Sequence, residues 1–160
     1  MRAAVQALAV AGVLVLAAGA DEEKKIPLDQ VPKKVLDAVK AKYPGATLRG
    51  ATKGVEDKEV YYTIALKHKD DDYEVTLTPE GEITEVAREI DVKDLPAAVS
   101  AAVAKKFPGA TIQEADEVRE PGEKGKLTYY VELTTADKKR LEVTFDPGGQ
   151  VVKQKEIKED

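Results

Sequence analysis

The chain has 160 residues, of which 30 are acidic and 25 are lysine or arginine, and its formal net charge is −5. This mildly acidic, well-mixed balance excludes a typical nucleic-acid-binding protein, which needs a concentrated basic surface. There is no cysteine, so neither a disulfide nor an acylated cysteine supports the chain. Stability must come from packing, and a chain of this length buries roughly two thirds of its unfolded surface.

The first twenty residues are typical of a secretory signal peptide. Arg2 precedes a weakly apolar run, and Ala18-Gly19-Ala20 stands directly before a charged segment. The alternative is an uncleaved membrane anchor, although the run is short of the roughly 20 strongly apolar residues that a span requires. We predict residues 1–20 as signal peptide, residues 21–27 as linker, and a periplasmic or secreted protein of the bacterial cell envelope.

Side chains for catalysis are scarce. The only serine, Ser100, lies in a helical pattern and the only histidine, His68, in a charged hairpin, so we expect no Ser-His-Asp triad. One histidine without cysteine cannot supply a transition-metal site. Two carboxylates would suffice for a glycosidase, but with 30 acidic residues such pairs carry no information. We predict no enzyme activity, no cofactor and no metal site.

Two nearly identical segments, KYPGAT at 42–47 and KFPGAT at 106–111, each follow a stripe of apolar residues spaced by four. The stripes are Val31, Val35 and Val39 in the first half, and Leu95, Val99 and Val103 in the second. Such a stripe predicts a helix with one apolar side. A residue before proline is disfavoured in the helical region, so we expect the helices to end at Tyr43 and Phe107.

After each helix the apolar period changes from four to two, which predicts strands. The expected strands are 47–53, 59–67, 72–78 and 82–89 in the first half, and 111–118, 127–134, 140–146 and 150–157 in the second. Proline and glycine in the segments 78–82 and 146–150 predict tight hairpins between the last two strands of each half.

The predicted fold class is therefore α+β, with two tandem repeats that each combine a helix with a four-stranded antiparallel sheet. The first repeat comprises residues 28–90, and the second comprises residues 91–160 with a charged C-terminal tail. One helix covers only one side of a sheet, so we expect the helices on one face and an open, polar sheet face on the other. Whether the two sheets join edge to edge stays open, although the short link from Arg88 to Asp94 favours close packing.

The tandem arrangement resembles the PepSY-like, β-lactamase-inhibitor-like periplasmic proteins over about residues 28–157. In the first half the matching residues are Pro32, Tyr43-Pro44-Gly45-Ala46, Tyr73-Glu74-Val75, Gly81 and Ile83. In the second half they are Pro96, Phe107-Pro108-Gly109-Ala110, Leu141-Glu142-Val143, Gly149 and Val151. The resemblance implies a β-lactamase-inhibitor-protein-like architecture whose sheet surface grips another protein. The chain departs from the characterised inhibitor in its lack of cysteine and its low aromatic content of 5%.

Five residues are the candidate contacts for a partner. They are Tyr61, Tyr130, Asp70, Asp71 and Asp72. Strand parity places the two tyrosines on the polar face, where large amphipathic side chains contribute most to affinity. The alternative is that they simply cover a sheet edge, since tyrosine is a good strand former. The three aspartates suit a basic pocket on a partner or a hard cation such as Ca²⁺, or else a solvated turn whose charges discourage edge pairing.

These patterns predict a non-catalytic exported binding module that recognises a protein or peptide of the cell envelope through its open sheet face. Inhibition of a hydrolase or peptidase is the best-motivated specific form. The alternative is a periplasmic protein that binds a small ligand or a cation such as Ca²⁺. Neither nucleic acid nor, after signal cleavage, the membrane is an expected partner.

Overall fold

The computed structural model describes residues 23–122 and 125–157. The expected signal peptide, with its cleavage position, lies outside the described residues, and so do the last three residues of the charged tail. In the described part of the chain, no helix is both long and apolar enough to span a membrane.

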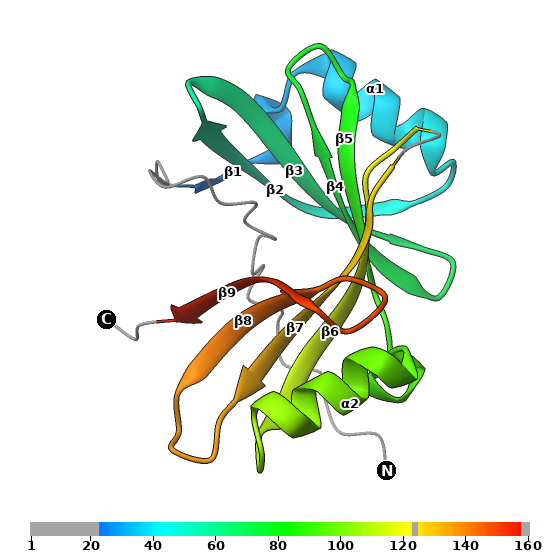
Figure 1. Cartoon of the computed structure of the whole chain (residues 1–160). Helices are drawn as coiled ribbons and strands as arrows, with labels where there is room; N and C mark the ends of the chain where they lie inside the picture. The colour runs from blue at the N-terminus through cyan, green and yellow to red at the C-terminus, as the bar shows by residue number, and fades with distance from the viewer. Residues whose placement is uncertain (1–22, 123–124, 158–160) are drawn as a thin grey trace, which may run out of the picture.

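The strands form one antiparallel sheet of nine strands, each paired with its neighbours in the chain (Figure 1). The first five are β1 (Lys24–Ile26), β2 (Thr47–Glu56), β3 (Glu59–His68), β4 (Asp71–Leu77) and β5 (Ile83–Glu89). The last four are β6 (Thr111–Arg119), β7 (Leu127–Thr134), β8 (Arg140–Phe145) and β9 (Val151–Ile157). Two helices, α1 (Lys33–Lys42) and α2 (Ala97–Lys106), follow the 3₁₀ turns η1 (Leu28–Gln30) and η2 (Val92–Asp94).

The fold class predicted from the sequence is wrong, because the structure is one continuous, mostly β sheet and not two repeats with a sheet each. The strands β5 and β6 pair from Val86 opposite Arg119 to Glu89 opposite Asp116. The N–H of Ile90 extends this pairing by donating to the carbonyl of Ala115 at 2.9 Å. An unpaired strand edge exposes a row of N–H and C=O groups, and joining the two inner edges satisfies both rows at once.

A ninth strand lies in the segment assigned to a linker. Lys24–Ile26 pair with β2 from Lys24 opposite Lys53 to Ile26 opposite Ala51. A segment of three residues is too short to show an alternation of apolar and polar residues, so the sequence alone gives no signal for this strand. It covers the outer edge of β2 and leaves β1 and β9 as the edge strands of the sheet.

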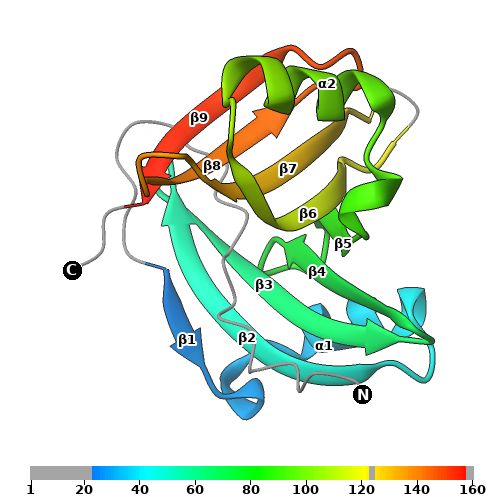
Figure 2. The same ribbon diagram turned by 90° about the horizontal axis from the view of Figure 1, so that it is seen from below.

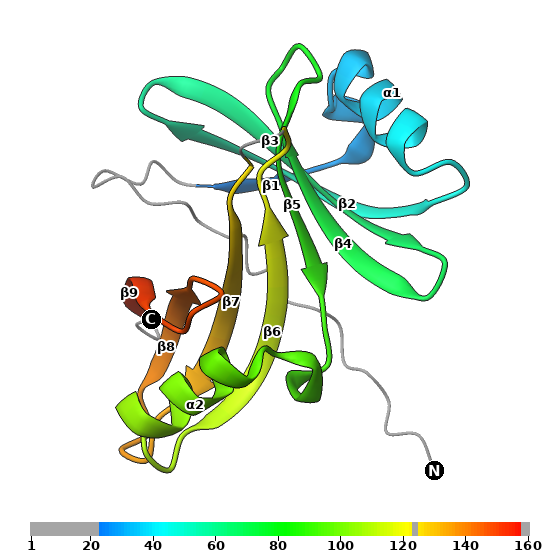
Figure 3. The same ribbon diagram turned by 45° about the vertical axis from the view of Figure 1, so that its right-hand side comes forward.

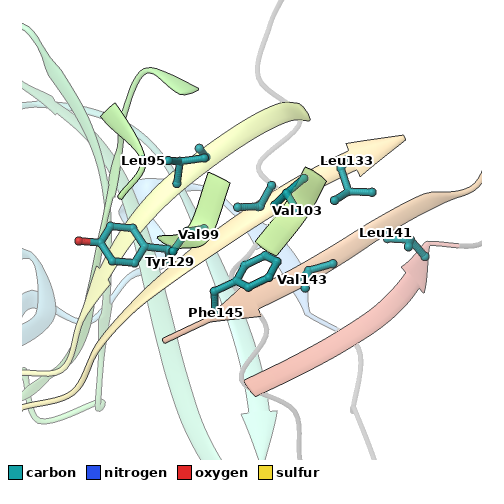
Figure 4. Packing of buried hydrophobic residues seen from close by; sticks show 10 residues of the cluster. Leu95, Val99, Val103, Tyr129, Leu133, Leu141, Val143 and Phe145 are labelled. Atoms are coloured by element: carbon teal, nitrogen blue, oxygen red, sulfur yellow. The ribbon is translucent and has the colours of Figure 1, made fainter. Parts of the chain in front are cut away.

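Both helices pack on the same face of the sheet, and each has its own apolar core. Val35 and Val39 of α1 pack with Ile64, Leu66, Val75 and Leu77, and Val99 and Val103 of α2 pack with Val131, Leu133, Val143 and Phe145. Figure 4 shows the second of these cores. The helices lie over different halves of the sheet, far from each other (Figure 3).

The helices end where the proline signals predict. The N–H groups of Tyr43 and Phe107 close the last turns by donating to the carbonyls of Val39 and Val103. Gly45 and Gly109 then take φ angles of 79° and 75°, a left-handed conformation that glycine adopts at little cost.

The sheet curls away from the helices, so that its other face is concave (Figures 1 and 2). The pairing register shifts between Leu48 and Gly50 in β2 and between Ile112 and Glu114 in β6, and such bulges increase twist and bending. The sequence predicts an open, polar face here, but parts of that face are buried. The concave face is polar, but Thr63 is only 5% exposed on it and Tyr130 only 3%.

Candidate partner-binding face

The concave face is lined by threonines in the first half of the chain. Thr52, Thr63 and Thr76 lie opposite one another across β2, β3 and β4. The hydroxyls of Thr63 and Thr76 are hydrogen-bonded at 3.1 Å, and the hydroxyl of Thr52 donates to the carboxylate of Glu23. These bonds account for the buried threonines, since a buried hydroxyl is costly without a partner.

A pocket of about 280 Å³ opens at one end of this threonine row. Tyr61, Thr76, Glu56, Glu85 and Glu120 contribute to its lining. The ring of Tyr61 lies over Gly54, since a Cβ atom on Gly54 would come within 2.2 Å of the ring atom Cζ. The glycine therefore leaves the space that holds Tyr61 at the wall of the pocket.

Glu85, in the lining of this pocket, is a weaker acid than an ordinary glutamate. Burial raises its pKa from 4.5 to about 7, the nearby charges of Glu120 and Glu56 add to the rise, and Lys153 opposes it. Lys153 belongs to β9, so its influence on Glu85 is consistent with the two halves of the curled sheet facing each other across the concave side. A half-neutral carboxyl group in a small pocket can both donate and accept a hydrogen bond.

The second half of the concave face is acidic. Glu114, Glu132 and Glu142 lie in register across β6, β7 and β8, and Asp116 lies opposite Tyr130. We call Glu114, Asp116, Glu132 and Glu142 the acidic cluster. Within the described part of the chain, Glu132 is the one member with a hydrogen-bonded base: Arg140 donates to its Oε1 from Nε at 3.2 Å and also from Nη2.

Burial and mutual repulsion change the acidity of the cluster. Burial raises the pKa of Asp116 from 3.8 to about 8, with further repulsion from Glu114, Glu74 and Glu89. Burial likewise raises the pKa of Glu114 from 4.5 to about 7, and the charges of Glu132, Glu89 and Glu142 add to the rise. Near neutral pH Asp116 is thus mostly protonated and Glu114 about half protonated, because no opposite charge stabilises their ionised forms.

Tyr130 lies on the concave face, opposite Asp116. Its ring packs with Ala87 and Val118, and its hydroxyl is buried without a hydrogen-bond partner among the described residues. Burial raises its pKa, and the charges of Glu142 and Glu132 add to this effect. Strand parity predicts the correct face for Tyr130 but not its burial.

The three aspartates of the hairpin lie elsewhere. Asp70, Asp71 and Asp72 line a separate hollow of about 440 Å³ with Arg88, Asp91 and other residues around the start of η2. Asp72 pairs with Arg49 at 2.8 Å and Asp71 lies 4.0 Å from Arg88. The structure therefore does not bring the five sequence-predicted contacts together: Tyr61 and Tyr130 share the concave face at separate positions, and the aspartates are apart from both.

The acidic cluster was missed from the sequence. Alternation places Glu132, Glu142 and the tyrosines on the polar side of their strands, but many acids in this chain have the same parity. Their convergence depends on the register of three strands and on burial, which alternation does not report. The described residues contain no group of three or more His, Cys, Asp or Glu side chains that could hold a metal ion.

Comparisons with known proteins agree with this architecture. A protein-family model described as "Putative beta-lactamase-inhibitor-like, PepSY-like" matches residues 20–85 and 61–153. A solved structure described among the "putative periplasmic proteins" of Bacteroides eggerthii is 24% identical, with a TM-score of 0.64, and the match covers 79% of this chain and 89% of that chain.

A BLIP-like protein from Bacteroides fragilis is 22% identical with a TM-score of 0.60, and this match covers 79% of this chain and 86% of that chain. At these identities the structures show a shared fold and no more. No match was found among curated proteins. The family match spans most of the chain, and the chain belongs to the PepSY-like, β-lactamase-inhibitor-like family.

Proposed function

We propose that this protein is a non-catalytic binding module of the cell envelope, which recognises a protein or peptide partner through the concave face of its sheet. The observation that carries the proposal is the pocket at Tyr61, because it provides a recess with an aromatic wall and polar groups on a curved polar surface. An interface of this kind gains most of its affinity from a side chain that fills such a recess.

The family supports this role through its description as β-lactamase-inhibitor-like. The name of the BLIP-like relative from Bacteroides fragilis and the periplasmic description of the Bacteroides eggerthii protein are in keeping with it. We further propose inhibition of a hydrolase or peptidase as its specific form, and export through the N-terminal twenty residues.

Site-specific photo-crosslinking tests the binding role. A benzophenone amino acid replaces Tyr61 in one variant and the exposed Lys40 of α1 in the control, and both are expressed in the producing cell. We expect a discrete adduct from position 61 that position 40 does not form. Adducts that are equal at both positions, or absent at position 61, would contradict recognition by the concave face.

Enzyme assays test the inhibitory form. The protein is added to a panel of β-lactamases and periplasmic peptidases, with Tyr61→Ala as the matched variant. Inhibition that is lost in Tyr61→Ala is the expected result. If no enzyme of the panel is inhibited, the proposal of inhibition is wrong. The binding role is then decided by the crosslinking experiment alone.

A further inference from the structure

The acidic cluster contains more carboxyl groups than its own bases pair with. Arg140 donates hydrogen bonds to Glu132, and Lys155 lies opposite Glu142 across β8 and β9. The side chains of Glu114 and Asp116 make no ion pair or hydrogen bond with other described residues, whereas their backbones belong to the β6 ladder. Asp116 is only 7% exposed as a residue, and a buried carboxyl group is costly to ionise without a counter-charge.

The hydroxyl of Tyr130 supplies a second, independent observation. Its oxygen is fully buried and has no hydrogen-bond partner among the described residues, and burial together with the charges of all four carboxylates of the cluster raises its pKa. Leaving a buried polar group unpaired costs roughly 1–3 kcal/mol. Folded proteins rarely keep such groups, and where they do a missing ligand is one of the physical explanations.

We propose that the acidic cluster around Tyr130 is a binding site for an arginine side chain of the partner that the concave face recognises. Glu114 and Glu142 are half-buried, so they are the groups that an incoming side chain meets first. The guanidinium group presents five N–H donors and no acceptor, which complements a set of carboxylate oxygens with a phenol oxygen. Its planar fork bonds carboxylates in pairs and is more weakly hydrated than an ammonium group, which favours arginine over lysine in a buried site.

Binding is coupled to proton release in this arrangement. The arriving cation favours the ionised forms of Glu114 and Asp116, whose pKa values are raised to about 7 and about 8 in the free protein. Each protonated carboxyl group gives its proton to solvent as the ion pair forms. Affinity for the cation therefore increases with pH across this range, because less free energy is spent on deprotonation at higher pH.

The charged and titratable groups on this part of the face come from six strands. They are Glu74 of β4, Glu89 of β5, Glu114 and Asp116 of β6, Tyr130 and Glu132 of β7, Arg140 and Glu142 of β8, and Lys153 and Lys155 of β9. The three bases lie on the β8–β9 side, whereas the uncompensated acids lie on β6. The cation is thus expected over β6 and β7, beside Tyr130.

Fluorescence anisotropy with synthetic peptides tests the proposal on the intact protein. The probe is a short labelled peptide of alternating arginine and serine, and its control replaces every arginine with citrulline, which keeps the shape but has no charge. The variants are the double change Glu114→Gln with Asp116→Asn, the single change Tyr130→Phe, and Glu80→Gln at an exposed turn as the matched control. The amide variants keep the shape of carboxyl groups that have no counter-charge, so we expect them to fold, and thermal melts of each variant check this.

We expect the arginine peptide to bind more tightly than the citrulline peptide, and more tightly at pH 9 than at pH 6. The double variant should weaken binding at least about tenfold, Tyr130→Phe a few-fold, and Glu80→Gln not at all. Equal binding of the two peptides, an unchanged affinity in the double variant, or competition by millimolar Ca²⁺ that the double variant abolishes would each overturn the proposal.

This inference rests on the proposed binding role, yet the two can fail separately. An adduct at position 61 with no charge-dependent peptide binding would leave recognition by the concave face standing and remove the arginine site. If position 61 forms no adduct but the arginine peptide still binds through the acidic cluster, the cation site stands. The Tyr61 pocket would then not belong to the recognition surface.

Discussion

Gly149, in the turn between β8 and β9, lies directly against the backbone carbonyl of Ala98 in the first turn of α2. A Cβ atom on Gly149 would come within 2.4 Å of that oxygen, and φ of Gly149 is 82°. The matching turn of the first half places Gly81 against the carbonyl of Lys34, where a Cβ atom would lie at 2.7 Å. Each hairpin turn thus packs onto the start of the helix that covers its strands.

The change Gly149→Ala should destabilise the protein by about 2–4 kcal/mol, because it combines a left-handed backbone with a contact to a backbone atom that cannot move alone. Urea unfolding measures the loss. Gly50→Ala is the matched control, since a Cβ atom there meets nothing within 4 Å. Equal effects of the two changes would show that the turn does not depend on this close contact.

Gly54→Ala should move the ring of Tyr61 with little loss of stability. The methyl group would meet the far end of a side chain that can rotate away, and alanine is better suited to a strand than glycine. The Hα protons of Gly54 lie beneath an aromatic ring, so the parent should show them shifted upfield in its NMR spectrum. Unaltered Tyr61 ring signals in the variant would contradict this packing.

Stability should fall as pH rises from about 4 to about 8. An aspartate in the unfolded chain loses its proton near pH 4, whereas folded Asp116 holds its proton up to about pH 8. The unfolded state binds fewer protons across this window, so the free energy of unfolding decreases with pH there, and the contribution is fully present only below about pH 4.

Asp116→Asn should remove this contribution and stabilise the protein by about 1–3 kcal/mol at pH 8, with a flatter dependence on pH. Urea unfolding at several pH values compares the parent, this variant and Glu80→Gln, whose carboxyl group is exposed. A variant that follows the parent at every pH would show that Asp116 is ionised in the folded protein at neutral pH.

The amide of Ile90 should exchange slowly with solvent deuterium. It donates to Ala115 at 2.9 Å where β5 and β6 join the two halves of the sheet. Amides in such a ladder open only with the surrounding structure, so protection should approach that of the central strands. Fast exchange at Ile90, with slow exchange in β3 and β7, would mean that the halves separate in solution.

Local spacing was enough to find most elements of this protein. The four-residue stripes of Val35 with Val39 and of Val99 with Val103 predicted the helices, and proline after Tyr43 and Phe107 predicted their ends. Alternation predicted eight of the nine strands, since it reports which side of a segment is apolar. The same alternation placed Tyr61 and Tyr130 on the face opposite the helices.

The amino-acid sequence by itself therefore determined the helices, most strands, the turns and the family, all of which depend on residues close together in the chain. Only the tertiary structure decided that β5 and β6 merge the halves into one sheet, that the sheet curls, and that Glu114, Asp116, Glu132 and Glu142 converge around a buried Tyr130. Edge pairing uses backbone groups that every residue has, so no side-chain pattern records which edges meet. The convergence of distant carboxylates then follows from that register and from the curvature of the sheet.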